Sequence, residues 1–247
     1  MRDGAGGGEA TLGAAGTAAE AVEIMAFGAH PDDVEIGAGG SLLKAVRSGY
    51  RIGIVDLSQG EAAANGTASE RQKEAQAAAA GLGAKFRVNL GLPDGKIGVE
   101  KDISPLVRLL RQYRPRIVLA PWPEDTHPDH RAAAELLRQA LFWAKSPGYL
   151  PEIPPHAVAR SFGYFINGGR EPRLVVDVSE HHREKLAVVK LHRSQFCLEA
   201  GRVNTRLNGE FLAEVASRER YYGSLVGVEY AEGFWVEGPV PLSQLLS

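Results

Sequence analysis

The stretch that decides the fold is Val22–Glu35, VEIMAFGAHPDDVE, in which an apolar run is followed at once by polar residues. Its first part, Val22–Ala29, has the length and composition of a buried strand. The next four residues, His30-Pro31-Asp32-Asp33, begin as a turn because proline fixes φ. A helical pattern over Ala38–Ser48 follows. The stretch therefore predicts a strand, a polar turn and a helix in succession.

The same alternation continues along the next hundred residues. Further strands are expected at Arg51–Leu57, Lys85–Leu90 and Arg116–Pro121, and helices at Ser69–Leu82, Asp102–Tyr113 and Pro128–Ala144. Ser69 and Gln72 have the spacing of a capping box at the start of the second helix. Four strand–helix units predict an α/β fold, a Rossmann-like parallel sheet with helices on both faces.

The pattern changes after a proline-rich stretch that begins near residue 146. Strands are expected at Arg160–Ile166 and Arg173–Val178, helices at Ser179–His192 and Glu210–Tyr222, and an extended piece at Val226–Val236. We interpret these as a C-terminal elaboration of one domain spanning residues 22–247. Residues 1–21 are rich in Gly and Ala and are predicted to be a flexible extension outside the fold.

Composition excludes several classes of function. The net charge of −2 and the pI near 6.4 give no support for nucleic-acid binding. No apolar run is long enough to span a bilayer, so no membrane partner is expected. Cys197 is the single cysteine, so an intrachain disulfide is excluded and any metal must be held by His, Asp or Glu. These features predict a cytoplasmic protein.

A second polar segment, Thr126–His130, follows the fourth expected strand and repeats the His-Pro-Asp sequence of the first. In the common doubly wound order, the first and fourth strands are neighbours where the strand order reverses. Ligands bind in the crevice beyond the carboxyl ends of these strands. We therefore expect the segments at His30 and His127 to meet at one site.

The residue types in these two segments suit metal-assisted hydrolysis. Two imidazoles and a carboxylate, from His30, Asp33 and His130, form a three-ligand zinc set that leaves a position for water. Asp32 is then placed to act as general base and acid. His127 would stabilise the oxyanion, and Asp129 would hold His127 in its cationic form.

Two other readings of these segments stay open on the sequence. His-Pro-Asp is also ordinary loop chemistry, since proline fixes φ and aspartate caps helices. The run Gly37–Gly40 could belong to a nucleotide-binding module without hydrolytic activity, although it lacks the spacing of the dinucleotide fingerprint. We favour small residues that let the helix pack closely.

The segments AHPDDVEIGAGG (29–40) and HPDH (127–130) resemble the PIG-L-type (LmbE-like) zinc deacetylases. Similarity continues through NLGLPDG, YFING and RYYGSLVGVEYAEGF and is strongest to the bacillithiol-biosynthesis branch, which deacetylates N-acetylglucosaminyl malate. The resemblance implies one Zn²⁺, a homo-oligomer, and the same roles for His30, Asp33, His130, Asp32 and His127–Asp129. A site of two histidines and one aspartate also accepts iron, manganese or cobalt, so the metal stays open on the sequence. In mycothiol-type relatives a tyrosine that assists catalysis stands where this chain has Asp125. The assistance of this tyrosine is therefore absent here or comes from another residue.

The resemblance also implies contacts with the sugar. Arg71 would bind sugar hydroxyls or a carboxylate, and Asp94 would bind a hydroxyl, although LPDG is equally a turn. A malate aglycone requires cationic partners, for which Arg193 is the first candidate, with Arg218 or Arg220 as others. Another acetylated sugar or thiol conjugate, of the mycothiol or chitobiose type, remains an alternative substrate.

Overall fold

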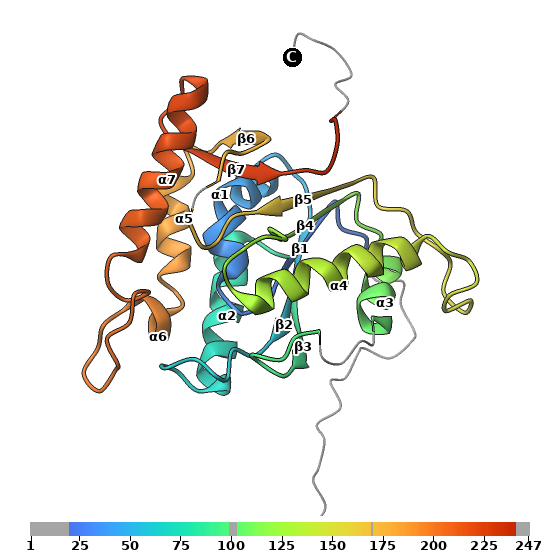
Figure 1. Ribbon diagram of the computed structural model, residues 1–247, viewed down its shortest axis with the longest axis horizontal. Helices are drawn as coiled ribbons and strands as arrows, with labels where there is room; N and C mark the ends of the chain where they lie inside the picture. The colour runs from blue at the N-terminus through green and yellow to red at the C-terminus, as the bar shows by residue number, and fades with distance from the viewer. Residues whose placement is uncertain (1–19, 99–102, 169, 241–247) are drawn as a thin grey trace, which may run out of the picture.

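The computed structural model describes residues 20–98, 103–168 and 170–240, so the predicted extension lies almost entirely outside the described residues. Its strands form one seven-stranded sheet in the order β3-β2-β1-β4-β5-β7-β6 (Figure 1). The strands are β1 Ile24–Gly28, β2 Ile52–Ser58, β3 Phe86–Leu92, β4 Ile117–Pro121, β5 Arg160–Tyr164, β6 Leu174–Asp177 and β7 Ala231–Trp235.

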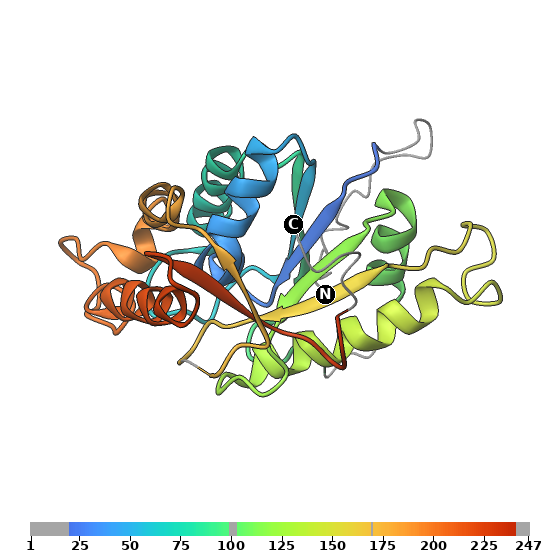
Figure 2. The ribbon, with the colours of Figure 1, turned by 90° about the horizontal axis from the view of Figure 1, so that it is seen from above.

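Helices cover both faces of this sheet (Figure 2). They are α1 Asp33–Arg47, α2 Ala68–Leu82, α3 Ser104–Tyr113, α4 Pro128–Ala144, α5 His182–Val189, α6 Arg193–Phe196 and α7 Phe211–Val226. Alternate residues of β1 face opposite sides: Ala26 packs in the core beneath α1, whereas Met25 and Phe27 pack in the core beneath α3 and α4. The α/β fold with two helical layers is confirmed.

The sheet is mixed and not wholly parallel. Strands β3, β2, β1, β4 and β5 are parallel, as the strand–helix alternation predicts. The last strand, β7, inserts between β5 and β6 and runs antiparallel to both. Its position satisfies the backbone groups on the facing edges of β5 and β6. The apolar pattern of residues 226–236 indicated an extended piece but gave no direction.

The first helix begins earlier and packs closer than its pattern indicated. It starts at Asp33 and not at Ala38, so the Gly37–Gly40 run lies inside the helix. A Cβ on Gly37 would lie 2.0 Å from Tyr164 Cδ2, and one on Gly40 would lie 2.9 Å from Val178. Close packing against the sheet is therefore the reason for these glycines, as we favoured.

Helix α2 begins two residues before the position that the expected capping box indicated. Its N-cap is Thr67, whose Oγ1 accepts a hydrogen bond from Glu70 N at 3.2 Å. The expected pair Ser69 and Gln72 lies inside the helix. Within the part of the chain that the structure describes, no helix combines the length and apolarity needed to cross a membrane.

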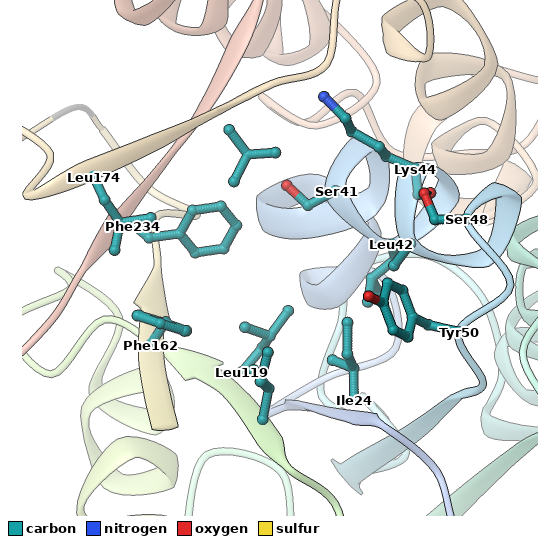
Figure 3. A pocket seen from close by; sticks show the side chains of 13 residues that line it. Ile24, Ser41, Leu42, Lys44, Ser48, Tyr50, Leu119, Phe162, Leu174 and Phe234 are labelled. Atoms are coloured by element: carbon teal, nitrogen blue, oxygen red, sulfur yellow. The ribbon is translucent and has the colours of Figure 1, made fainter. Parts of the chain in front are cut away.

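An apolar pocket of about 280 Å³ lies between α1 and the strands (Figure 3). Its walls are mostly aliphatic and aromatic side chains, including Ile24, Leu119, Phe162 and Phe234. The one lysine among its described lining residues, Lys44, donates its Nζ hydrogen to Asp177 O at 2.8 Å. This pocket offers no convergent catalytic groups.

Candidate active site

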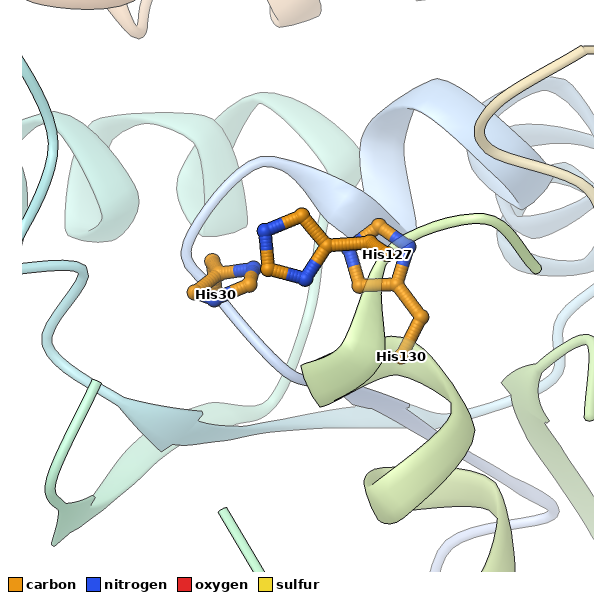
Figure 4. A group of neighbouring side chains, drawn as sticks. All are labelled: His30, His127 and His130. Atoms are coloured by element: carbon orange, nitrogen blue, oxygen red, sulfur yellow. The ribbon is translucent and has the colours of Figure 1, made fainter. Parts of the chain in front are cut away.

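The loops after β1 and β4 meet at the carboxyl end of the sheet. The two strands pair in parallel, with Ile24 opposite Ile117. Figure 4 shows His30, from the loop after β1, beside His127 and His130 at the start of α4. The ring centroid of His30 is 4.9 Å from that of His127 and 5.4 Å from that of His130. These side chains line a pocket of about 540 Å³. The strand order thus brings the two segments together.

Asp33 lies between two of the imidazoles. Its Oδ2 is 3.5 Å from His30 Nδ1, and its Oδ1 is 3.2 Å from His130 Nε2. The other nitrogen of each ring faces a different carboxylate. His30 Nε2 is 3.1 Å from Asp94 Oδ1 and 3.4 Å from Asp129 Oδ2, while His130 Nδ1 is 3.0 Å from Asp125 Oδ1. Each imidazole therefore has one nitrogen toward Asp33 and one held by a second carboxylate.

The electrostatics of the site favour a bound cation. Burial opposes the charged form of His30, but hydrogen bonds to Asp129, Asp33 and Asp94 outweigh it and hold the His30 pKa well above its usual value. Burial likewise opposes a charge on His130, yet Asp33 and Asp125 raise its pKa to about 9. Four carboxylates, those of Asp33, Asp94, Asp125 and Asp129, thus face the two imidazoles, and a divalent metal ion would balance this excess of negative charge.

The donor set fits a metal such as zinc, which takes imidazole and carboxylate ligands. Among the residues that the structure describes, two groups of three have donor atoms within 4.8 Å of one another: His30, His127 and His130, and His30, Asp94 and Asp129. The predicted set of His30, Asp33 and His130 is neither of these two groups, but the contacts of its imidazoles suit metal binding. It leaves His30 Nε2 and His130 Nδ1 on carboxylates, the arrangement that orients metal-binding histidines in proteins.

Asp32 is buried beside these groups in an unusual conformation. Its φ of 115° lies in the region that disfavours side chains, and its carboxylate makes no cap for α1. Arg71 Nη2 donates to Asp32 Oδ2 at 3.2 Å and to Pro31 O at 2.7 Å, and Arg71 Nη1 donates to Gly60 O at 2.8 Å. Burial raises the pKa of Asp32 to about 6, although Arg71 favours its charged form. Arg71 thus holds Asp32 in place.

His127 caps α4 and presents one ring nitrogen to the pocket. Its Nδ1 accepts a hydrogen bond from Asp129 N at 3.2 Å, so a neutral ring carries its hydrogen on Nε2. Burial and the neighbouring His130 and His30 lower the pKa of His127. The Asp129 carboxylate instead accepts from Gly95 N at 2.7 Å and faces His30. The contact between Asp129 and His127 is thus made by the Asp129 backbone N–H, and the expected support of a cationic His127 by the Asp129 carboxylate stays a prediction.

The sugar-contact candidates separate into two groups. Asp94 and Arg71 line the pocket, although both already have protein partners. Arg193 pairs with Glu199 at the surface and does not line it. Arg218 donates to Ile166 O and Gly168 O, and Arg220 lies exposed beside Tyr230.

From the sequence we assigned no role to three residues of the site, Asp125, Asn167 and Arg206. Asp125 Oδ1 accepts from His127 N at 2.8 Å, and its carboxylate also accepts from Asn167 N and Nδ2 at 3.1 Å each. Asn167 and Arg206 line the outer part of the pocket. An aspartate two residues before His127 was a usable signal for Asp125. Arg206 comes from a distant loop without a motif.

Comparison with known proteins decides the family. The family model of GlcNAc-PI de-N-acetylase (PIG-L) matches residues 25–141, which include both loops. Diacetylchitobiose deacetylase of Thermococcus kodakarensis is 30% identical over 85% of this chain and 81% of its own length. The chain belongs to the GlcNAc-PI de-N-acetylase family. It is accordingly a hydrolase that removes N-acetyl groups.

Other relatives of this deacetylase agree with the assignment. A 1D-myo-inositol 2-acetamido-2-deoxy-alpha-D-glucopyranoside deacetylase of Saccharopolyspora erythraea is 26% identical over 80% of this chain and 89% of its own. The solved structure of the conserved protein TT1542 from Thermus thermophilus has a TM-score of 0.83 and 36% identity, covering 92% of this chain and 99% of that one.

Proposed function

We propose that this deacetylase hydrolyses the acetamide of an N-acetylglucosamine conjugate, N-acetylglucosaminyl L-malate of bacillithiol biosynthesis in particular, with Zn²⁺ held by His30, Asp33 and His130. The observation that carries the proposal is the position of Asp33 between two imidazoles whose other nitrogens rest on carboxylates. Zinc, when bound, lowers the pKa of a water molecule and polarises a carbonyl group.

The residues of the chain divide the remaining chemistry. Asp32 accepts a proton from the water that attacks the acetyl carbonyl, and then delivers it to the nitrogen of the departing amine. A pKa of about 6 suits both transfers near neutral pH. Arg71 holds the Asp32 carboxylate through the two transfers. His127 Nε2–H donates to the carbonyl oxygen as negative charge develops on it.

The substrate class rests on the relatives and on the size of the pocket. Both curated relatives above are named for acetylated glucosaminides. A pocket of about 540 Å³ is within the range of small-molecule sites. The malate conjugate is supported by the resemblance of the motifs to the bacillithiol branch. A chitobiose-type sugar is the alternative substrate, supported by the diacetylchitobiose deacetylase.

Acetate release from a panel of glycosides tests the proposal. Purified protein should release acetate from acetylglucosaminyl malate, diacetylchitobiose and an acetylglucosaminyl inositol at different rates. A chelator should abolish release, and zinc should restore it. Acetate release that is unaffected by chelation would contradict the metal assignment. Nucleotide binding without acetate release would instead favour a non-enzymatic module.

A further inference from the structure

One side of the active-site pocket comes from segments near α6, α7 and the end of β5. Its residues are Ile166, Asn167, Gln195, Arg206, Leu207 and Phe211. A second pocket of about 160 Å³ adjoins it and shares Ile166, Arg206 and Phe211. Arg206 therefore lines both pockets.

Arg206 is also the available cation of the site. Among the described residues that line the larger pocket, Arg71 and Arg206 alone carry a permanent positive charge. Arg71 is 3% exposed and donates to Pro31 O, Gly60 O and Asp32. Both Nη atoms of Arg71 thus already donate to protein oxygens. The adjoining pocket adds Arg218, whose Nη1 donates to the backbone oxygens of Ile166 and Gly168, whereas Arg206 pairs with the exposed carboxylate of Glu214.

The loop that carries Arg206 is fixed to the fold by a buried amide. Asn65, 6% exposed, accepts a hydrogen bond from Val203 N at 2.8 Å and donates to Val203 O at 2.8 Å. The guanidinium of Arg206 lies 4.8 Å from the ring centroid of Phe211, and its Nη1 is 3.5 Å from Asn167 Oδ1. These contacts position the guanidinium at the pocket wall.

The present partner of Arg206 is a replaceable one. Its Nε and Nη2 both face the carboxylate of Glu214, and about half of each side chain is exposed. Exposed ion pairs of this kind contribute little stability. A substrate carboxylate has the same planar shape and would bind the same fork of N–H groups. Exchange of one carboxylate for another requires no new cavity.

We propose that Arg206 is a specificity-determining residue that selects glucosaminides whose aglycone carries a carboxylate. The guanidinium exchanges Glu214 for the substrate carboxylate while the acetamide lies between Asp32 and His127. This inference rests on the proposed deacetylation and adds a residue that recognises the group attached to the sugar.

The test compares two substrates, acetylglucosaminyl malate and the neutral methyl N-acetylglucosaminide, by the ratio of their kcat/KM values for acetate release. For Arg206→Gln we expect this malate-to-methyl ratio to fall about 10- to 100-fold, because a charge-assisted pair is lost. Arg206→Lys should recover part of it, since a lysine keeps the charge without the fork. Glu214→Gln should raise the ratio by freeing the guanidinium.

The matched control is Arg138→Gln on α4, an exposed arginine whose Nε and Nη2 also fork onto a glutamate, Glu135. It should leave the ratio unchanged. An unchanged ratio in Arg206→Gln, or a wild-type enzyme without preference for the malate conjugate, would overturn the inference while deacetylation stands. No acetate from any glycoside would overturn the proposed function, and this inference with it. Zinc content and circular dichroism of each variant check that it folds.

Discussion

The same tripeptide, His-Pro-Asp, follows β1 and β4, yet the two copies adopt different conformations. In the loop after β4, His127 has a φ of −76°, caps α4 and places Asp129 in the first helical turn. In the loop after β1, Asp32 has a φ of 115° and caps nothing with its side chain. Asp129 faces His30, whereas the Asp32 carboxylate is held by Arg71.

The two loops differ in how closely their backbones follow the favoured geometry of a helix start. The loop after β4 follows ordinary helix-start chemistry, with a capping side chain and proline at the first position. In the loop after β1, the Asp32 side chain makes no helix-capping hydrogen bond and its backbone has a strained φ. The Asp32 carboxylate lines the pocket instead. Strain of this kind persists when surrounding contacts enforce it, and here Arg71 supplies them.

The largest expected effect is a difference in kcat between variants of Asp32 and of Asp129. Asp32→Ala should lower kcat by about 10²- to 10⁴-fold with zinc content unchanged, because the general base is lost. Asp129→Ala should cost far less turnover, since its carboxylate contacts His30 Nε2 and Gly95 N and takes no proton in the proposed reaction. Steady-state acetate release and metal analysis measure both. Similar losses in the two variants would remove the functional contrast between the loops.

The next effect concerns the histidines of the two copies. His127→Ala should lower kcat by about 10²- to 10³-fold, because the donor to the developing oxyanion is removed. Its zinc content should equal that of the wild type, whereas His30→Ala should lose the metal. Zinc lost from His127→Ala would instead identify His30, His127 and His130 as the ligand set.

A smaller effect is expected from the residue that holds the strained loop. Arg71→Gln should lower kcat by about 10- to 100-fold with little change in KM, because Asp32 loses its positioning contact. The matched change Arg131→Gln removes an arginine that donates to Asp125 O and Thr126 O in the other loop. A large rise in KM for Arg71→Gln at constant kcat would show that Arg71 binds substrate, as the sequence suggested.

The smallest effect is a reversal of stability order between the two loops. At position 32, glycine should be more stable than alanine by about 1 kcal/mol, because a φ of 115° suits glycine. At position 129, alanine should be more stable than glycine by about 0.5–1 kcal/mol, because that residue is helical. Urea unfolding of the metal-free variants measures both differences. The same order at both positions would refute the assigned strain.

Much of this site could be predicted from the sequence because it depends on strand order. Four strand–helix units place β1 beside β4, and a His-rich segment after each strand then converges at one edge. The residues that were missed depend on contacts between distant segments. Arg206, for example, lies in a loop that Asn65 holds by two hydrogen bonds to Val203, more than a hundred residues away in the sequence.

The direction of β7 and the backbone conformation of Asp32 could not be predicted from the sequence. The direction of β7 depends on which strand edges are free after β5 and β6 have formed, and its apolar pattern is the same in either direction. The left-handed φ of Asp32 has no signal, because the residue is an aspartate and not a glycine. The hydrogen bond from the Asp129 backbone N–H to His127 was also not expected, because it depends on the conformation of the loop before α4.

The contact of Gly37 with the Tyr164 ring limits how this enzyme can be re-engineered. Tyr164 also donates its hydroxyl hydrogen to Phe27 O at 2.7 Å, so one ring fixes both α1 and the strand leading to His30. A single added methyl group at position 37 would shift Asp33 with its helix. A mutant library aimed at new acetylated sugars should therefore leave α1 intact and randomise residues 199–209.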